Sequence, residues 1–310
     1  MKSVFTTRVL LALAATMLMW GSAFAGIRAG LRAYSPGQLA VFRFVVASIT
    51  LGVYAGVAHF RRLQRRDFTG MIVTGIIGVT FYNLALNYGE TTVTAGAASL
   101  LIASVPIWTT LLAIFALREK LSALGAVGVL ISFLGVALIA TSQGEGVHFS
   151  PKALIILAAA VSSAVYMVLQ KQFLERYSAL EFTAYSTWIG TLLMLPFGHG
   201  LGHGLVTAPA GSTLAILYLG IFPGALAYVG WAYVLSHGPA GKTSSWLYLN
   251  PVFAILIAWA WLGEVPGTRS LVGGAIALAG VALVYWKRKS AGENDAQAST
   301  PIVCRDFSSS

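Results

Sequence analysis

Long stretches without a charged side chain restrict the fold of this chain more than any other feature of its sequence. Eight such stretches contain no Asp, Glu, Lys or Arg, and they cover residues 9–27, 68–89, 91–117, 121–144, 153–170, 182–241, 243–263 and 270–286. Charged residues make up 10% of the chain, against about 25% in soluble domains. Because so few polar groups cannot cover the surface of a water-soluble globule, the sequence predicts an integral membrane protein.

The stretches predict ten membrane-spanning helices. Residues 182–241 are long enough for two spans, because His199, Pro209 and several glycines interrupt the apolar run. Residues 37–60 form one more span, which contains a single charge at Arg43. Each span can cross a hydrocarbon core about 30 Å thick. Continuous apolar runs are typical of helices, whereas the strands of membrane barrels alternate, so the expected fold class is an all-α integral membrane protein.

The first span has an alternative interpretation as a signal peptide. Lys2 and Arg8 precede an apolar run that ends in Ala23-Phe24-Ala25, a pattern typical of a cleavage site. Cleavage would leave nine spans and remove part of the internal repeat described below. The uncleaved helix is therefore the preferred interpretation.

Basic residues orient the predicted spans. With the amino terminus inside, fifteen Lys and Arg residues lie in inside segments and four lie outside, namely Arg28, Arg32, Lys152 and Arg269. Because positively charged loops stay on the cytoplasmic side, both termini are expected in the cytoplasm. Residues 290–310 are polar and are expected to form a disordered cytoplasmic tail. The net charge of +10 is thus explained by topology, and no nucleic-acid partner is expected.

The sequence matches itself after a shift of 145 positions. Identical residues fall on one another in a single register: Pro106 on Pro251, Glu119 on Glu264, and Gly135-Val136-Ala137-Leu138 on Gly280-Val281-Ala282-Leu283. Each copy would hold five spans, with residues 1–144 in the first and 145–289 in the second. An odd number of spans places the second copy upside down relative to the first. Inverted repeats around a central cavity are typical of secondary transporters.

The residues of the two copies also resemble a known family. Trp20-Gly21-Ser22-Ala23-Phe24 in the first span, 39–44 in the second and Leu117-Arg118-Glu119-Lys120 after the fourth resemble the EamA family of the drug/metabolite transporter superfamily. The resemblance extends over nearly the whole chain up to Lys289. It implies a bacterial inner-membrane exporter of small metabolites, and the aromatic-rich spans are most similar to the aromatic amino acid exporters of bacteria.

The resemblance and the repeat together predict an exporter of aromatic or hydrophobic amino acids that works by alternating access as a monomer. No Asp or Glu lies at the centre of a span, and the glutamates at 90, 119, 181 and 264 lie near span ends. Because ion coupling normally needs a titratable group within the membrane, uncoupled facilitated diffusion is expected. A proton-coupled exporter of drugs or other metabolites is the alternative within the superfamily, and a membrane enzyme or receptor is the alternative from another class.

Sequence motifs for catalysis or metal binding are missing from the chain. The five histidines are scattered near span ends or in loops, and the single cysteine, Cys304, lies in the polar tail. We therefore expect no enzyme activity, no cofactor and no metal site. The expected partners are a small-molecule substrate and the lipid bilayer.

Polar and aromatic side chains within the spans are the candidates for a substrate site. The shift of 145 places Asn83 on Tyr228 and Leu86 on Trp231. Tyrosines suit an amphipathic substrate because an aromatic face carries a hydroxyl, whereas Asn83 has interhelical hydrogen bonding as an equally weighted alternative. The predicted substrate-binding residues are Trp20, Tyr82, Asn83, Leu86, Tyr166, Trp188, Tyr228, Ser244 and Tyr248.

Three further residues within spans have two interpretations each. Arg43 can bind a substrate carboxylate through its guanidinium, or its long side chain can extend to the outer membrane surface and serve the fold. The structural role is preferred, because the family that the chain resembles carries a basic residue here across differing substrates. Pro106 and Pro251 are expected within helices, where each removes a backbone hydrogen bond and favours a kink. Such kinks either bend as the cavity opens and closes or are static.

Overall fold

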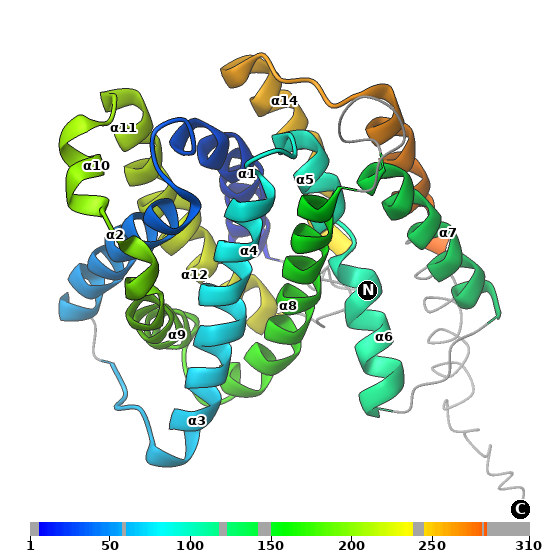
Figure 1. Cartoon of the computed structure of the whole chain (residues 1–310). Helices are drawn as coiled ribbons and strands as arrows, with labels where there is room; N and C mark the ends of the chain where they lie inside the picture. The colour runs from blue at the N-terminus through cyan, green and yellow to red at the C-terminus, as the bar shows by residue number, and fades with distance from the viewer. Residues whose placement is uncertain are drawn as a thin grey trace, which may run out of the picture.

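The computed structural model describes residues 6–57, 60–117, 123–141, 150–237, 245–280 and 282–283. Within these ranges every regular element is a helix, as Figure 1 shows. The all-α class is therefore confirmed for the part of the chain that the structure describes. The predicted tail at 290–310 and the repeated glutamate Glu119 lie outside the described residues.

Several helices are long and apolar enough to cross a membrane. Five pass by length and composition, namely Thr7–Gly30, Pro36–Gly56, Arg65–Gly89, Pro151–Phe173 and Ala210–Ser236. A sixth candidate is the pair Ala179–Gly198 and Leu201–Thr207, which is bent by 80°. Shorter apolar helices cover Ala95–Thr109, Leu124–Ile139 and Asn250–Leu262. The described helices thus account for five or six full-length spans, and the ten-span arrangement stays a prediction.

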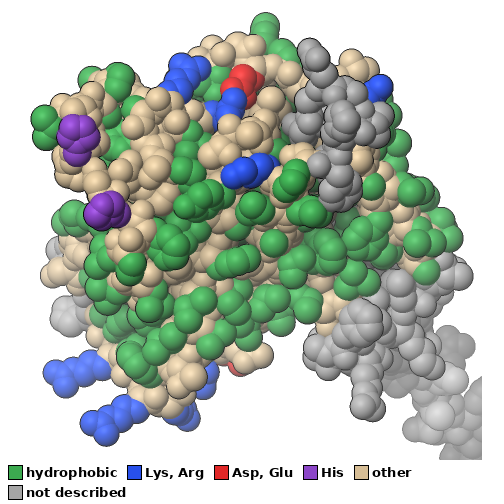
Figure 2. Space-filling model, in the orientation of Figure 1, with side chains coloured by type: hydrophobic (Ala, Val, Ile, Leu, Met, Phe, Trp, Pro, Cys, Tyr) green, Lys and Arg blue, Asp and Glu red, His purple; other side chains and the backbone are tan. Residues whose placement is uncertain are grey.

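The surface carries the side chains that a lipid environment requires. Figure 2 shows hydrophobic side chains across the middle of the molecule, with Lys and Arg side chains at its upper and lower edges. Large apolar side chains are exposed on several helices, for example Val53 at 70%, Leu134 at 69% and Leu192 at 66%. Exposed apolar surface of this kind is unfavourable in water and stable in contact with lipid tails.

Helix α1 (Thr7–Gly30) packs against three helices from the second half of the chain. These are α14 (Asn250–Leu262), α12 (Ala227–Ser236) and α11 (Ala210–Leu219). Gly21 allows the closest approach, because a Cβ there would lie 2.5 Å from the Cβ of Phe253. A residue without a side chain is therefore required where α1 crosses α14.

Helix α8 (Pro151–Leu174) packs against helices from the first half of the chain. Its neighbours are α4 (Tyr82–Gly89), α5 (Ala95–Ile102) and α6 (Val105–Leu117). Helices α2 (Pro36–Val57) and α9 (Ala179–Met194) pack on one another, where the hydroxyls of Ser48 and Thr191 are 2.9 Å apart. The two halves of the chain therefore interleave instead of forming separate bundles (Figure 1).

Two helical segments contain a π-helical stretch at positions exactly one repeat shift apart. The first, η1 (Gly75–Phe81), joins α3 (Arg65–Thr74) to α4, and the second, η3 (Gly220–Leu226), joins α11 to α12. In η3 Pro223 has no N–H for an α-helical hydrogen bond. Single π-helical turns occur frequently at functional sites, and Tyr82 and Tyr228 follow these two stretches within two residues.

Pro106 and Pro251 each lie in the first turn of a helix, and the kinks expected at them stay a prediction. Helix α5 ends at Ile102 and α6 begins at Val105, so Pro106 is the second residue of α6. Helix α14 follows the 3-10 helix η4 (Ser245–Leu249), and Pro251 is again its second residue. The first turn tolerates a proline because the missing N–H has no helical partner there. The regular α-helix of each apolar segment is therefore interrupted shortly before its proline.

Helix α7 (Ala123–Ala140) lies at the edge of the bundle beside helical residues 268–280 (Figure 1). Ser132 donates a hydrogen bond of 3.0 Å to the carbonyl of Ala277, which lies 145 positions further along the chain. The remaining short elements, the 3-10 helix η2 (Leu195–Gly198) and α10 (Leu201–Thr207), follow α9 and lead to α11.

Candidate functional site

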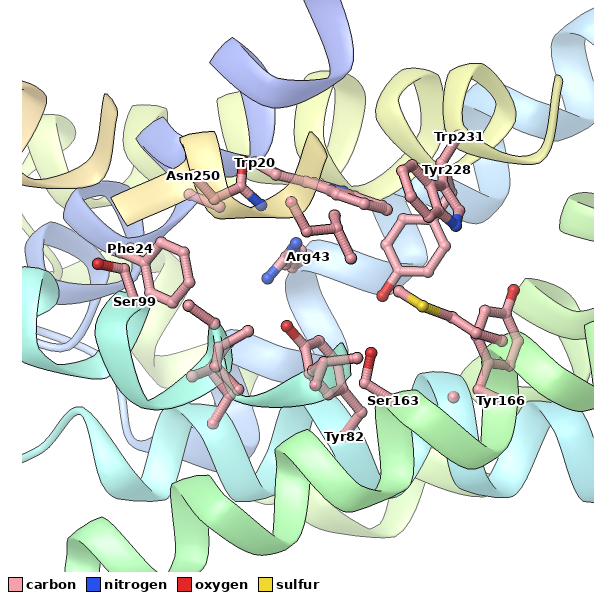
Figure 3. A pocket seen from close by; sticks show the side chains of 18 residues that line it. Trp20, Phe24, Arg43, Tyr82, Ser99, Ser163, Tyr166, Tyr228, Trp231 and Asn250 are labelled. Carbon is pink, nitrogen blue, oxygen red and sulfur yellow. The ribbon is translucent and has the colours of Figure 1, made fainter. Parts of the chain in front are cut away.

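A cavity lies between the helices of the interleaved halves, and its lining is shown in Figure 3. Its volume is about 70 Å³, whereas a single water needs about 10–15 Å³. The first half of the chain contributes Trp20, Phe24, Arg43, Tyr82, Leu86 and Ser99, among others. The second half contributes Ser163, Tyr166, Met167, Tyr228, Trp231 and Asn250, among others.

Aromatic rings from α1 and α12 form one wall of the cavity. Trp20 meets Tyr228 edge to face with the ring centroids 5.7 Å apart, and its centroid is 5.4 Å from that of Trp231. Figure 3 shows the three rings along the same side of the cavity. Such a wall favours ligands with an apolar or aromatic part, since aromatic pairs add to the energy of surface burial.

Hydroxyl groups lie on the opposite wall. Figure 3 shows the hydroxyls of Tyr82 and Ser163 directed toward the cavity, while the hydroxyl of Tyr166 points away from it. The ring of Tyr166 fits against Gly78 of η1, where any Cβ would overlap the ring. The cavity therefore combines apolar surface with a few polar groups, as small-molecule sites generally do.

Arg43 supplies the only charge among the lining residues that the structure describes. Its side chain is 3% exposed, and its Nε and Nη1 atoms are buried without a hydrogen-bond partner in the described part of the chain. The guanidinium lies 5.3 Å from the centroid of the Phe44 ring. Its burial does not fit the predicted extension to the membrane surface, because a snorkelling side chain keeps its charge in water.

Five of the predicted binding residues line the cavity: Trp20, Tyr82, Leu86, Tyr166 and Tyr228. Asn83 is fully buried beside the lining, where its Nδ2 donates to the Val79 carbonyl at 2.9 Å and to the Tyr228 hydroxyl at 3.4 Å. This geometry matches the interhelical hydrogen bonding that was the alternative for Asn83.

The other predicted residues do not join this group. Trp188 lies outside the cavity, donating from Nε1 to the Ser48 carbonyl at 3.1 Å and packing on Phe60 and Tyr185. Ser244 lies outside the described residues, and so does the side chain of Tyr248.

Several lining residues were not among the predicted binding residues, and the polar or aromatic ones are Phe24, Ser99, Ser163, Trp231 and Asn250. A signal existed for Trp231, because the repeat shift pairs it with Leu86. Ser163 lines the cavity, whereas the neighbouring Ser162 faces η1 and donates to the Ile77 carbonyl at 2.6 Å. The sequence carries no comparable signal for Phe24 or Asn250.

A second polar cluster joins the ends of α1, α4 and α14. Arg28 forms an ion pair with Glu264 at 3.0 Å and donates to the backbone carbonyl of Glu90 at 2.7 Å. Glu264 also accepts a hydrogen bond of 3.3 Å from the N–H of Ala95. The cluster thereby connects α1, the start of α5 and the residues after α14.

Glu90 is the unusual member of this cluster. It follows the last residue of the Arg65–Gly89 helix, is fully buried, and has no hydrogen-bond partner for either carboxylate oxygen in the described structure. Burial raises the pKa of its carboxyl well above the usual range, and the neighbouring Arg28 opposes this shift. The described residues contain no group of three or more His, Cys, Asp or Glu that could hold a metal ion.

Comparisons with known proteins point to one family. The model of the EamA-like transporter family matches the chain twice, at residues 7–141 and 150–286. A probable terminal-alkyne amino-acid exporter of Streptantibioticus cattleyicolor is 39% identical over 94% of this chain and 96% of its own length. The uncharacterized transporter YdfC of Bacillus subtilis is 37% identical over 91% of this chain and 92% of its own length.

One solved crystal structure aligns with 93% of this chain and 99% of its own, with a TM-score of 0.63 and 22% sequence identity. At this identity the alignment supports the fold alone.

Proposed function

The chain belongs to the EamA-like transporter family and is a multi-pass membrane protein, and we propose that it exports amino acids with aromatic or hydrophobic side chains. The observation that carries the proposal is the cavity, because residues from both family matches line it and aromatic rings form one of its walls. An amino acid of this kind combines an apolar part with a charged part, as the lining combines aromatic rings with Arg43.

One relative supports the proposed substrate class. The probable exporter of Streptantibioticus cattleyicolor is named for a terminal-alkyne amino acid. Its similarity extends over nearly all of both chains. The names of the relatives indicate transporters and not enzymes.

We further propose that the two halves, 1–144 and 145–289, are inverted copies of five spans each. The family model matches both halves, and the π-helices Gly75–Phe81 and Gly220–Leu226 lie 145 positions apart. Residues one shift apart also touch, as Asn83 and Tyr228 do. A two-fold axis would bring equivalent residues into contact in this way, and two inverted copies can exchange conformations to open the cavity alternately to each side.

The proposed topology has ten spans, both termini in the cytoplasm and a monomer in the bacterial inner membrane. It rests on the excess of basic residues in the segments assigned to the inside. Single cysteines placed at Arg32 and at Arg62, with Cys304 replaced, provide the test. A membrane-impermeant thiol reagent added to intact cells should label the cysteine at 32 and not the one at 62, and the opposite result contradicts the orientation.

The transport step is proposed to be uncoupled facilitated diffusion. No carboxylate is found among the described residues that line the cavity, and ion coupling normally needs a titratable group within the membrane. The proton-coupled alternative gains one specific observation, the buried and unpaired carboxyl of Glu90. Glu90 lies one helical turn beyond the lining residue Leu86, which makes it the first residue to replace in a coupling experiment.

The decisive experiment measures flux with the purified protein in proteoliposomes. We expect export of phenylalanine, tryptophan and leucine down their gradients, with no export of sugars or cationic dyes. A pH gradient should not drive accumulation in the wild type. Proton-driven accumulation that disappears in Glu90→Gln contradicts uncoupled transport, and export of dyes without export of amino acids contradicts the substrate class.

Alternating access has its own test at the lining residues. Cysteines that replace Tyr82 and Tyr166, one at a time, should react with impermeant reagents from either side of the membrane. Phenylalanine should change which side reacts faster. Reaction from one side only, whether or not phenylalanine is present, contradicts alternating access.

A further inference from the structure

Arg43 presents a charge to the cavity that no other described lining residue balances. The side chain is 3% exposed, two of its nitrogen atoms are buried without a partner, and the described residues offer it no ion pair. Figure 3 shows the guanidinium pointing into the cavity between Trp20, Tyr82 and Asn250. A buried cation without hydrogen-bond or ion-pair partners is energetically unfavourable unless an anion binds to it.

The surroundings hold Arg43 in this position. Its backbone carbonyl lies against η3, where a Cβ on Gly220 would be 2.7 Å from that oxygen. Its Nε would be 3.6 Å from a Cβ on Gly224, which is van der Waals contact. Because η3 packs closely on α2 at this point, it holds the backbone of Arg43 in place. The contact with Gly224 also restricts the side chain, and the guanidinium is directed at the cavity. A purely structural role would require a partner in the protein, and among the described residues the ring of Phe44, at 5.3 Å, is its one cation–π contact.

We propose that Arg43 binds the carboxylate of the transported molecule and that the cavity does not require an α-ammonium group. This inference rests on the proposed function, since it assumes that the cavity holds the substrate. Among the described residues, the lining contains one positive charge and no carboxylate, so an ammonium group finds no ion-pair partner among them. The apolar part of the ligand then lies against the wall formed by Trp20, Tyr228 and Trp231. The substrate class is therefore organic carboxylates with an apolar or aromatic body, whether or not they carry an amino group.

The inference separates three related ligands. Phenylalanine carries both charges, N-acetylphenylalanine keeps the carboxylate without the ammonium, and phenylalaninamide keeps the ammonium without the carboxylate. Equilibrium binding to the purified full-length protein in detergent should give N-acetylphenylalanine an affinity at least equal to that of phenylalanine. Phenylalaninamide should bind at least about tenfold more weakly, as expected when a charge-assisted hydrogen bond is lost.

Variants of Arg43 test the assignment to this residue. Arg43→Gln should reduce the preference for N-acetylphenylalanine over phenylalaninamide by at least about tenfold, and Arg43→Lys should keep part of it because the charge remains. The exposed Arg32, replaced in Arg32→Gln, is the matched control and should leave the preference unchanged. The ratio of two affinities is the measurement, because a merely structural role would lower both together. Should Arg43→Gln not fold, the wild-type ligand series and Arg43→Lys still decide.

Two results would overturn the inference. The first is that the wild-type protein binds phenylalaninamide as tightly as N-acetylphenylalanine, or that it binds none of the three ligands. The second is an Arg43→Gln variant that keeps the wild-type preference. Failure of the proposed function is a different result, namely binding with this preference but no flux of any of the ligands in proteoliposomes.

Discussion

Residues 75–89 and residues 220–234 have the same backbone plan and different side chains. Each begins with a seven-residue π-helix and continues as an α-helix, and the two lie 145 positions apart. The first presents Tyr82 and Leu86 to the cavity, and the second presents Tyr228 and Trp231. The difference indicates that the backbone of the site is duplicated while the chemistry of its lining is not.

The two segments also differ in what surrounds them. The second packs closely on α2 beside Arg43, whereas the first packs on α9 and ends next to the buried Glu90. At the position of Glu90 the second segment has Leu235, which is buried and apolar. Four predictions sharpen this comparison, from the largest expected effect to the smallest.

The largest effect, a change in how stability depends on pH, is expected at Glu90. The repeat shift of 145 pairs this charged residue with the apolar Leu235. Because burial raises the pKa of its carboxyl, the folded protein binds a proton that the unfolded chain releases near pH 4.3. The protonated carboxyl of Glu90 therefore contributes to the free energy of unfolding. This contribution is complete below about pH 4.3 and is lost as pH rises through the raised pKa, by up to about 1.4 kcal/mol per pH unit. The unfolding midpoint of Glu90→Gln in detergent should therefore depend less on pH above about 4.3 than that of the wild type.

The exposed Glu175 provides the control for this experiment. Glu175→Gln should keep the pH dependence of the wild type, because this side chain is in contact with water in both the folded and the unfolded chain. If Glu90→Gln and the wild type share one pH profile, Glu90 is ionised in the folded protein and its difference from Leu235 has no energetic consequence.

The next effect concerns the glycines that begin the two π-helices. A Cβ at Gly220 would be 2.6 Å from the Cβ of Val46 and 2.7 Å from a backbone oxygen, so Gly220→Ala should lose about 1 to 3 kcal/mol of unfolding free energy. A Cβ at Gly75 would be 3.0 Å from its nearest neighbour. There the higher helix propensity of alanine, up to about 1 kcal/mol, should offset most of the strain. Denaturant titrations of the two variants should rank them in this order, and equal losses would show that the two contacts are equally tight.

The aromatic wall is the third point of comparison, since Trp231 takes the place of Leu86. Trp231→Leu should weaken phenylalanine binding by about 0.5 to 1.5 kcal/mol, or roughly two- to twelvefold, because the ring contact is lost. Leucine binding should change little, and Trp188→Leu, outside the cavity, should leave the ratio of the two affinities unchanged. An equal loss for phenylalanine and leucine would indicate a distorted cavity instead of a lost aromatic contact.

The smallest effect is expected for the hydrogen bond that joins the two segments. Tyr228→Phe removes the hydroxyl that accepts from Asn83 at 3.4 Å. The bond is long, so the loss of unfolding free energy should be about 0.5 to 1 kcal/mol. A loss above about 2 kcal/mol would mean that this contact is a main support of the interface between the segments.

Sequence reasoning predicted five of the lining residues because repetition and aromatic character mark them. Tyr82, Tyr228 and Trp20 stand out as large polar or aromatic groups within apolar runs. It placed Trp188 and Asn83 at the site as well, although they lie outside it or beside it. Helical spacing tells which residues share a face, but it does not tell which neighbouring helix that face meets.

Arg43 illustrates the same limit for a charged residue. From its distance to the helix end, an extended side chain that reaches the membrane surface is sterically allowed. Whether the side chain extends outward or inward depends on what packs around it. The approach of η3 to α2 at Gly220 and Gly224 is a long-range contact, and it leaves the guanidinium facing the cavity.

The sequence by itself determined the membrane class, the family and the internal repeat, because composition, charge placement and self-similarity are properties of the chain alone. Only the tertiary structure decided that Pro106 and Pro251 begin helices, that Trp231 and Asn250 complete the cavity, and that Arg43 is buried in it. The physical reason is that side-chain burial and direction follow from contacts between helices far apart in the chain. Local periodicity carries no information about these contacts.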